Sequence, residues 1–155
     1  MKKYLSAVLA IACLSSSALR AQDAAAVELE LKPHATNPLG YDKTELTVKK
    51  GVKVKLTLNN TGSAAPQPHN FILCKVGKLE AVGALANLMM TDPQGMAKSY
   101  IPENQEDILA HTKLVQIGQT ESIEFTAPAE AGDYPYLCSF PGHWLLMRGV
   151  MHVTE

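Results

Sequence analysis

The chain has 155 residues, with 14 lysines and arginines against 15 aspartates and glutamates, and a formal net charge of −1 at pH 7. This length suits one ordinary domain and is short for two. Without residues 1–21 the chain has 11 basic residues against 15 acidic ones, and this mildly acidic balance argues against a partner made of nucleic acid, because such proteins gather basic residues on one face.

The N-terminal segment predicts a signal peptide over residues 1–21. Lys2 and Lys3 form a short basic region, and the apolar stretch over residues 4–14 is too short to span a bilayer as a helix. Small residues follow, and we expect cleavage near Ala21. The sequence therefore predicts a periplasmic or otherwise exported protein with one domain over residues 22–155 and no transmembrane segment.

Two alternatives concern the same N-terminal segment. Ala18 is a second position at which a signal peptidase could cut, since it also ends a run of small residues. Cys13 closes an Ala-Ile-Ala-Cys stretch that resembles a lipobox, so lipid anchoring at Cys13 is a competing interpretation.

Apolar and polar residues alternate along most of the remaining chain, which is typical of half-buried strands. The clearest case places Val52, Val54, Leu56 and Leu58 on one face. We predict eight short strands: Val27–Leu31, Glu45–Lys49, Val52–Leu58, His69–Cys74, Thr112–Ile117, Ser122–Thr126, Asp133–Cys138 and Gly149–Thr154. Turn residues separate them, so the pattern predicts an all-β fold, an antiparallel β-sandwich.

One segment has a different period. Val82, Leu85, Ala86 and Met89 recur at helical spacing, which predicts a short amphipathic helix over residues 79–90. We expect the whole stretch of residues 75–110 to form a long excursion between two strands, with this helix at its start.

Four residues together suit a single metal ion. Cys138 ends a predicted strand, Pro141-Gly142 forms a turn, and His143 and Met147 follow, while His69 opens a strand far upstream. One thiolate, two imidazoles and one thioether are the ligands of a mononuclear blue-copper site, in which the Met is a weak axial ligand. We therefore expect one type 1 copper ion per chain, bound by His69, Cys138, His143 and Met147.

Each of these residues has a simpler interpretation when it is taken alone. Cys138 could form a disulfide with Cys74, because an exported chain with two cysteines often does so. A zinc site could use the cysteine and histidines, although zinc seldom takes methionine. His69 alone would be a structural histidine, and Met147 alone would be a core residue. The combination of all four favours copper.

The sequence Cys-Ser-Phe-Pro-Gly-His-Trp-Leu-Leu-Met-Arg-Gly of residues 138–149 closely resembles the ligand loop of azurins and auracyanins, which are bacterial cupredoxins. Residues 41–48 and 110–114 also look azurin-like, and the resemblance covers about residues 27–155. It implies a Greek-key β-sandwich with copper at one end. It also implies that three of the ligands are equatorial and that Met147 is axial.

The resemblance further implies that His143 lies at the surface within an apolar patch where redox partners dock. By position, Leu39, Pro141, Trp144 and Leu145 are the candidates for this patch, whereas Phe140 suits packing beneath the loop better. The amide of Asn70 is expected either to hydrogen-bond the loop around Cys138 or to close a local turn.

Two features depart from the azurin pattern. Azurins place Gly before the first His, where its carbonyl approaches copper, but this chain has Pro68, as in a plastocyanin-like Pro-His-Asn. We therefore expect a four-coordinate site. Azurins also have a disulfide that needs a cysteine near the start of the domain, where this sequence has none. Cys74 is therefore expected to be a free, buried thiol. The remaining histidines, His34, His111 and His152, are expected not to bind metal.

These features predict an electron-transfer protein rather than an enzyme. It would carry one electron between redox proteins, such as c-type cytochromes or a dehydrogenase or oxidase, that dock near His143. The alternative is a copper-binding or copper-delivery protein without an electron-transfer role, which would favour an exposed tract rich in Met and His. Copper nitrite reductases and multicopper oxidases combine several such domains, and a single domain without a spare histidine cluster argues against them.

Overall fold

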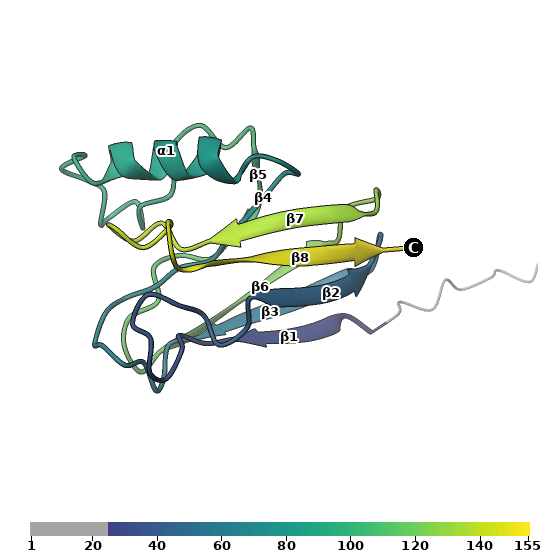
Figure 1. Cartoon of the computed structure of the whole chain (residues 1–155), viewed down its shortest axis with the longest axis horizontal. Coiled ribbons are helices and arrows are strands. Elements are labelled where there is room, and N and C mark those ends of the chain that lie inside the picture. Colours follow the sequence, from purple (N-terminus) through teal and green to yellow (C-terminus); the bar gives the residue numbers. More distant parts are fainter. Residues whose placement is uncertain (1–24) are drawn as a thin grey trace, which may run out of the picture.

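The computed structural model describes residues 25–155 as two packed β-sheets with one helix (Figure 1). The elements are β1 (Val27–Leu31), β2 (Glu45–Lys49), β3 (Lys53–Asn59), β4 (Ile72–Cys74), α1 (Leu79–Met89), β5 (Ile108–His111), β6 (Thr120–Thr126), β7 (Gly132–Leu137) and β8 (Arg148–Thr154). The expected signal peptide and Cys13 lie outside the described residues. Within these residues, no helix is long and apolar enough to cross a membrane.

The strands form a three-stranded sheet in the order β1-β3-β6 and a five-stranded sheet in the order β2-β8-β7-β4-β5. Consecutive strands repeatedly change sheet, as in a Greek-key sandwich. The prediction of a β-sandwich is confirmed, but not every pair is antiparallel, because β1 pairs with β3 and β2 pairs with β8 in parallel.

The core lies between the two sheets and follows the alternation of the sequence. In β3, Val54, Leu56 and Leu58 are fully buried, while the residues between them face outward. They pack in one cluster with residues of the opposite sheet, such as Tyr136 and Met151. Burying such a side chain stabilises the fold by about 1.5–3 kcal/mol, so the alternation fixes which face of each strand turns inward.

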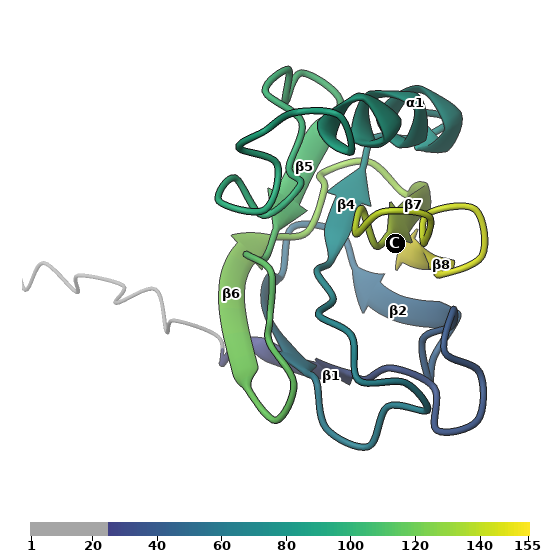
Figure 2. The ribbon, with the colours of Figure 1, turned by 90° about the vertical axis from the view of Figure 1, so that its left-hand side faces the viewer.

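Helix α1 forms where the sequence predicted it and covers the outer side of the five-stranded sheet near β7 (Figures 1 and 2). Its buried face includes Val82 and Ala86. Val82 packs in a second cluster with Ile72, Leu137 and Trp144. Trp144 belongs to the loop after β7, so the helix supports that loop directly.

The prediction of a strand over Thr112–Ile117 is wrong. The strand of this region is β5, four residues earlier, where Ile108 pairs with Cys74. After β5 the chain continues beside the segment that precedes β4. The Thr112 N–H donates to the Phe71 carbonyl, and Val115 forms an isolated bridge with His69. His111 therefore ends a strand, and the excursion after β4 ends before residue 108 and not at residue 110.

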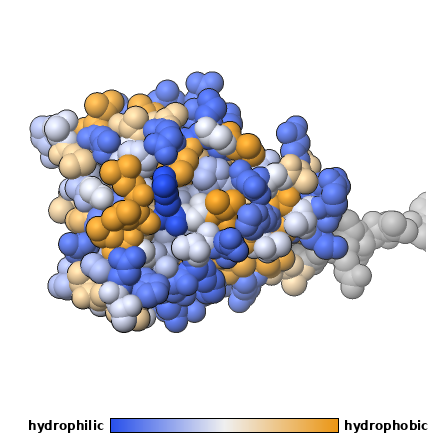
Figure 3. Space-filling view, viewed as in Figure 1, coloured by the Kyte–Doolittle hydropathy of each residue, from blue (hydrophilic) through white to orange (hydrophobic). Residues whose placement is uncertain are grey.

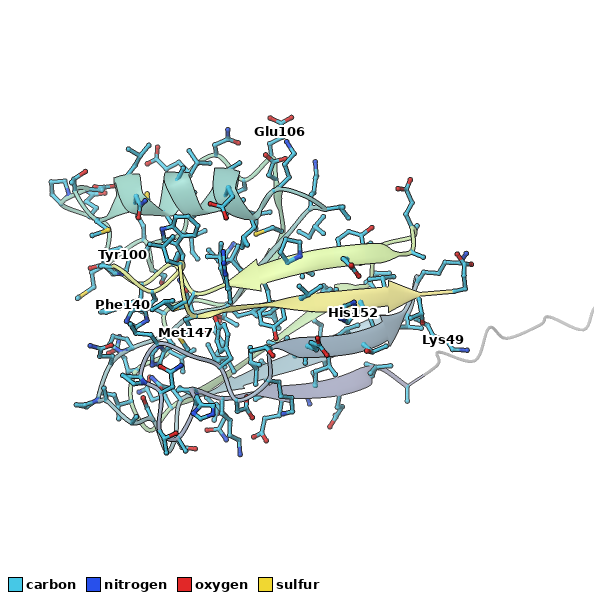
Figure 4. The ribbon with its side chains drawn as sticks, in the orientation of Figure 1. Lys49, Tyr100, Glu106, Phe140, Met147 and His152 are labelled. Carbon is cyan, nitrogen blue, oxygen red and sulfur yellow. The ribbon has the colours of Figure 1, made fainter. Side chains whose placement is uncertain are left out.

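All the segments that carry the expected ligands meet at one end of the sandwich. Strand β7 leads directly into the loop of residues 138–147, and β8 begins just after it. Figure 4 shows Tyr100, Phe140 and Met147 at this end, beyond the end of β7, while Lys49 and His152 lie toward the opposite end.

Candidate metal centre

The structure brings His69, Cys138 and His143 together in a buried cluster. Their ligand atoms all lie within 4.8 Å of one another. The Cys138 Sγ lies 3.9 Å from His69 Nδ1 and 3.7 Å from His143 Nδ1. Each of the three side chains is at most 2% exposed. His69 lies 69 residues before Cys138, with β4, α1, β5, β6 and β7 between them, so only the fold explains their proximity.

These distances fit a metal ion at the centre of the cluster. Zinc makes bonds of about 2.1 Å to nitrogen and about 2.3 Å to sulfur. If two such bonds met at the metal at about 120°, the nitrogen and the sulfur would lie about 3.8 Å apart. The separations of 3.9 and 3.7 Å match this value. A soft thiolate with two imidazoles in a trigonal arrangement is the donor set of a type 1 copper site.

The loop of residues 138–147 is closed by its own backbone. The Cys138 N–H donates to the Met147 carbonyl over 2.9 Å, and the Met147 N–H donates to the His143 carbonyl over 2.7 Å. Gly142 has φ of 82°, a left-handed conformation that glycine adopts freely, and it directs His143 back toward Cys138. Met147 is fully buried at the end of this loop, where its backbone carbonyl pairs with the Cys138 N–H.

Burial keeps the metal-free site neutral. It raises the pKa of the Cys138 thiol to about 12 and lowers the pKa of His69 to about 4, to which the neighbouring His143 also contributes. It lowers the pKa of His143 as well. Both imidazoles are therefore neutral at neutral pH. A metal ion that binds here must displace the thiol proton, since the thiolate is the ligand form of cysteine.

Asn70 joins the segment that carries His69 to the loop that carries Cys138. Its Oδ1 accepts a hydrogen bond from the Ser139 N–H over 2.8 Å, and its Nδ2 donates to the Ser139 Oγ and to the Ser99 carbonyl, both over 2.7 Å. The Tyr41 hydroxyl donates to the Asn70 carbonyl over 2.5 Å. Because all of these groups except Ser99 are buried, the bonds hold the two segments in a fixed relation.

The expectation of an exposed His143 is wrong. The ring is 2% exposed, and its Nε2 lies 2.9 Å from Gln67 Oε1. One face of the ring contacts Phe140, with ring centroids 4.8 Å apart. Phe140 is half-buried and packs against the core. Gln67 lies in a loop without a periodic pattern, so this contact could not be predicted from the sequence.

Trp144 is also not a surface residue, contrary to the prediction. It is 7% exposed, and its Nε1 donates to Asn87 Oδ1 of helix α1 over 2.9 Å. The next residues, Leu145 and Leu146, are 55% and 64% exposed. The prediction of an exposed Leu145 is therefore confirmed, whereas the exposure of Leu146 was not predicted.

The other cysteine and histidines of the described residues lie outside this cluster. Cys74 and Cys138 are both free, so the alternative of a disulfide between them is wrong. Cys74 is buried, which raises the pKa of its thiol to about 12. Within residues 25–155, the cluster of His69, Cys138 and His143 does not include His34, His111 or His152.

The fold and this cluster define a class of protein, the small copper-binding β-sandwich proteins. Comparison with known proteins agrees. The family described as copper binding proteins, plastocyanin/azurin family, matches residues 27–154. Auracyanin-A of Chloroflexus aurantiacus is 42% identical over 116 residues, which cover 75% of this chain and 68% of that protein. Azurin-1 of Alcaligenes xylosoxydans xylosoxydans is 34% identical over 120 residues, which cover 74% of this chain and 89% of that protein.

A solved structure shows the same similarity in three dimensions. Auracyanin A of Chloroflexus aurantiacus, described as a "blue" copper protein, superposes with a TM-score of 0.74 at 39% identity, covering 84% of this chain and all of that one. The chain belongs to the plastocyanin/azurin family of copper-binding proteins. Its cofactor is type 1 copper, which the donor set of the cluster fits.

Proposed function

We propose that this protein carries single electrons between redox proteins, with copper bound by His69, Cys138 and His143 as equatorial ligands and Met147 as the axial ligand. The observation that carries the proposal is the buried trigonal cluster of one thiol and two imidazole nitrogens. Met147, fully buried beside Cys138 in the loop, supplies the thioether. Copper in such a site alternates between Cu(I) and Cu(II).

The residues around the cluster suit an electron carrier better than an enzyme. Each of the three donor side chains is at most 2% exposed, so a substrate would find no direct access to the metal. The backbone bonds within the loop and the bonds of Asn70 fix the donors before metal binds. A site held in one geometry needs little rearrangement when its oxidation state changes, which favours fast electron transfer.

The surface nearest the cluster is apolar and suits brief docking of a redox partner, such as a c-type cytochrome. Leu145 and Leu146 are exposed, and Leu39 and Pro141 are half-buried. Figure 3 shows apolar surface at the end of the molecule where the loop after β7 lies. We define Leu39, Pro141, Leu145 and Leu146 as the docking patch, and Trp144 is excluded because it is buried. A small apolar patch allows contact without tight binding.

The N-terminal segment supports export as part of the proposal. The basic and apolar regions of residues 1–21 have the form of a signal peptide, and a periplasmic carrier would meet its partners after cleavage near Ala21. N-terminal sequencing of the protein recovered from the producing cells tests this. A sequence that starts at Gln22 supports it, whereas an acylated Cys13 would show a lipid anchor instead.

The electron-transfer role is tested by mixing the oxidised, copper-loaded protein with a reduced c-type cytochrome and following the blue band. We expect rapid bleaching, reoxidation by a mild oxidant and retention of copper through repeated cycles. Replacing Leu145 and Leu146 by Ser should slow bleaching and leave the band unchanged, whereas Val76→Ser, at an exposed apolar residue outside the docking patch, should have no effect. Loss of Cu(I) to a chelator in every cycle would favour copper delivery instead.

The ligand assignment has its own test. Cys138→Ser should abolish the blue colour, because the colour comes from charge transfer between the thiolate and copper. A variant that remained blue would show that Cys138 is not the copper ligand.

A further inference from the structure

His143 and His69 differ in what lies at their outer nitrogens. His143 Nε2 lies 2.9 Å from Gln67 Oε1. The Nε2 of His69 is buried and has no hydrogen-bond partner. Both rings turn Nδ1 toward the Cys138 Sγ. The two imidazoles thus both direct Nδ1 toward the Cys138 sulfur, but their Nε2 atoms have different surroundings.

We propose that Gln67 is a positioning residue for His143. Its side-chain oxygen accepts a hydrogen bond from His143 Nε2–H, fixes the tautomer whose Nδ1 faces Cys138, and covers the outer edge of the ring. This inference rests on the proposed function, because His143 acts as a ligand only if copper binds in the cluster.

The tautomer follows from the geometry of the two nitrogens. A neutral imidazole carries its proton on one nitrogen, and the other nitrogen is free to donate electrons to a metal. An amide oxygen only accepts hydrogen bonds. With Gln67 Oε1 at Nε2, the proton of His143 stays on Nε2 and Nδ1 keeps its lone pair toward the cluster.

The ring has little freedom to leave this position. The ring of Phe140 packs against it edge-to-face at a centroid distance of 4.8 Å, and the ring of His69 lies 5.1 Å away. Gln67 adds a directional contact at the outer edge, which ring packing alone does not provide. Together these contacts explain why His143 is 2% exposed.

The backbone of Gln67 is itself held in place. Pro66 and Pro68 flank it and fix φ on both sides. The Gln67 N–H donates to the Ala65 carbonyl over 2.9 Å, and its carbonyl accepts a hydrogen bond from Asn60 Nδ2 over 3.0 Å.

Asn60 extends this support to the first histidine. It is fully buried, and its Nδ2 also donates to the Val115 carbonyl over 2.9 Å. The same carbonyl accepts the hydrogen bond of the His69 N–H over 3.1 Å. The buried amide of Asn60 therefore links the backbone of Gln67 to the bridge between Val115 and His69. These bonds hold the backbone of Gln67 in a fixed position beside His143.

A hydrogen bond from the outer nitrogen makes an imidazole a better electron donor to a metal. A better donor stabilises Cu(II) more than Cu(I), so Gln67 should lower the reduction potential of the site. The unpartnered His69 has no such influence, and the contribution of Gln67 can be measured separately.

The test compares Gln67→Leu, which keeps the shape and loses the acceptor, with Gln67→Glu, which keeps an acceptor. Gln94→Leu, at an exposed turn residue, is the control. All proteins are loaded with copper, and the potential is measured by redox titration of the blue band. For Gln67→Leu we expect a rise equivalent to about a tenfold change in the Cu(I)/Cu(II) ratio, about 59 mV for one electron. Gln67→Glu and Gln94→Leu should not raise it.

A second readout does not depend on copper. Nitrogen NMR of the metal-free protein at neutral pH should show His143 protonated on Nε2 in the wild type and a mixture of tautomers in Gln67→Leu. Should Gln67→Leu fail to fold, Gln67→Asn, whose shorter amide does not reach the ring, takes its place with the same expected shifts.

The possible failures are distinguishable. An unchanged potential together with an unchanged tautomer in Gln67→Leu would overturn the role of Gln67 and leave the copper site intact. A wild-type protein that binds copper without a blue band would overturn the proposed function, while the tautomer of the metal-free protein would still decide whether Gln67 pairs with His143.

Discussion

Helix α1 supports the ligand loop through a contact that leaves no room for a methyl group. Gly83, in the middle of the helix, faces Trp144, and a Cβ at Gly83 would lie 2.3 Å from the Cε3 atom of the indole and 2.5 Å from Cδ2 and Cζ3. Carbon atoms in contact are ordinarily about 3.5–4.0 Å apart. In Gly83→Ala the indole must therefore move by more than about 1 Å.

The two effects of Gly83→Ala on stability oppose each other. Alanine favours the helix by about 1 kcal/mol relative to glycine. Overpacking of a full contact costs about 1–3 kcal/mol. Displacing the indole also breaks the hydrogen bond of Trp144 Nε1 to Asn87, which contributes about 1 kcal/mol. We expect the steric effect to win and the variant to lose about 1–3 kcal/mol, or about 3–5 °C in Tm per kcal/mol.

The assay uses the metal-free protein, because bound copper would add its own stabilisation. Urea unfolding gives the free energy, and fluorescence gives the position of the indole, since Trp144 is the single tryptophan of the chain. We expect a red-shifted emission in Gly83→Ala. In a double-mutant cycle with Trp144→Leu, the cost of Gly83→Ala should largely disappear.

A stabilised Gly83→Ala variant with unchanged emission would refute this reasoning. It would mean that helix propensity decides the outcome and that Trp144 does not pack on Gly83 as the structure shows.

Three further predictions concern the site. Asn70→Ala should cost the metal-free protein about 2–4 kcal/mol in urea unfolding, because it leaves the Ser139 N–H and the Ser99 carbonyl without partners; a loss below about 0.5 kcal/mol would contradict this. His69 should make the metal-free protein lose stability as the pH falls from 6.5 toward 4, by up to about 1.4 kcal/mol per pH unit, and His143, whose pKa is also lowered, adds to this loss. The folded pKa of His69 is about 4, so the unfolded chain binds the proton first. His69→Gln should weaken this dependence, and an equal dependence in that variant would exclude His69 as its source. Met147→Leu should keep the blue band and raise the reduction potential, since the thioether is lost; an unchanged potential would show that Met147 is not axial.

Much of the fold could be predicted from the sequence because alternation and burial agree. Residues such as Val54 and Leu56 are apolar at every second position and are buried as expected. The helix over residues 79–89 was also predictable from its spacing. The position of β5 was not, because Ile108–His111 has no alternating pattern, and its pairing with β4 is a tertiary contact.

The donor residues could be predicted because their types and spacing are specific to the chemistry. What surrounds them could not. Gln67 and Ser99 act through loop contacts that follow no period. The burial of His143 and Trp144 depends on Gln67 and on helix α1, and a family likeness in the loop sequence did not reveal either contact.

The proposed copper site is tested most directly by titrating Cu(II) into the purified protein of residues 22–155 and recording visible and electron-spin-resonance spectra. We expect one equivalent of copper, an intense blue band that bleaches reversibly with a mild reductant, and a narrow copper hyperfine splitting. A pale protein with a wide hyperfine splitting would show ordinary tetragonal copper and would contradict the proposed electron-transfer site.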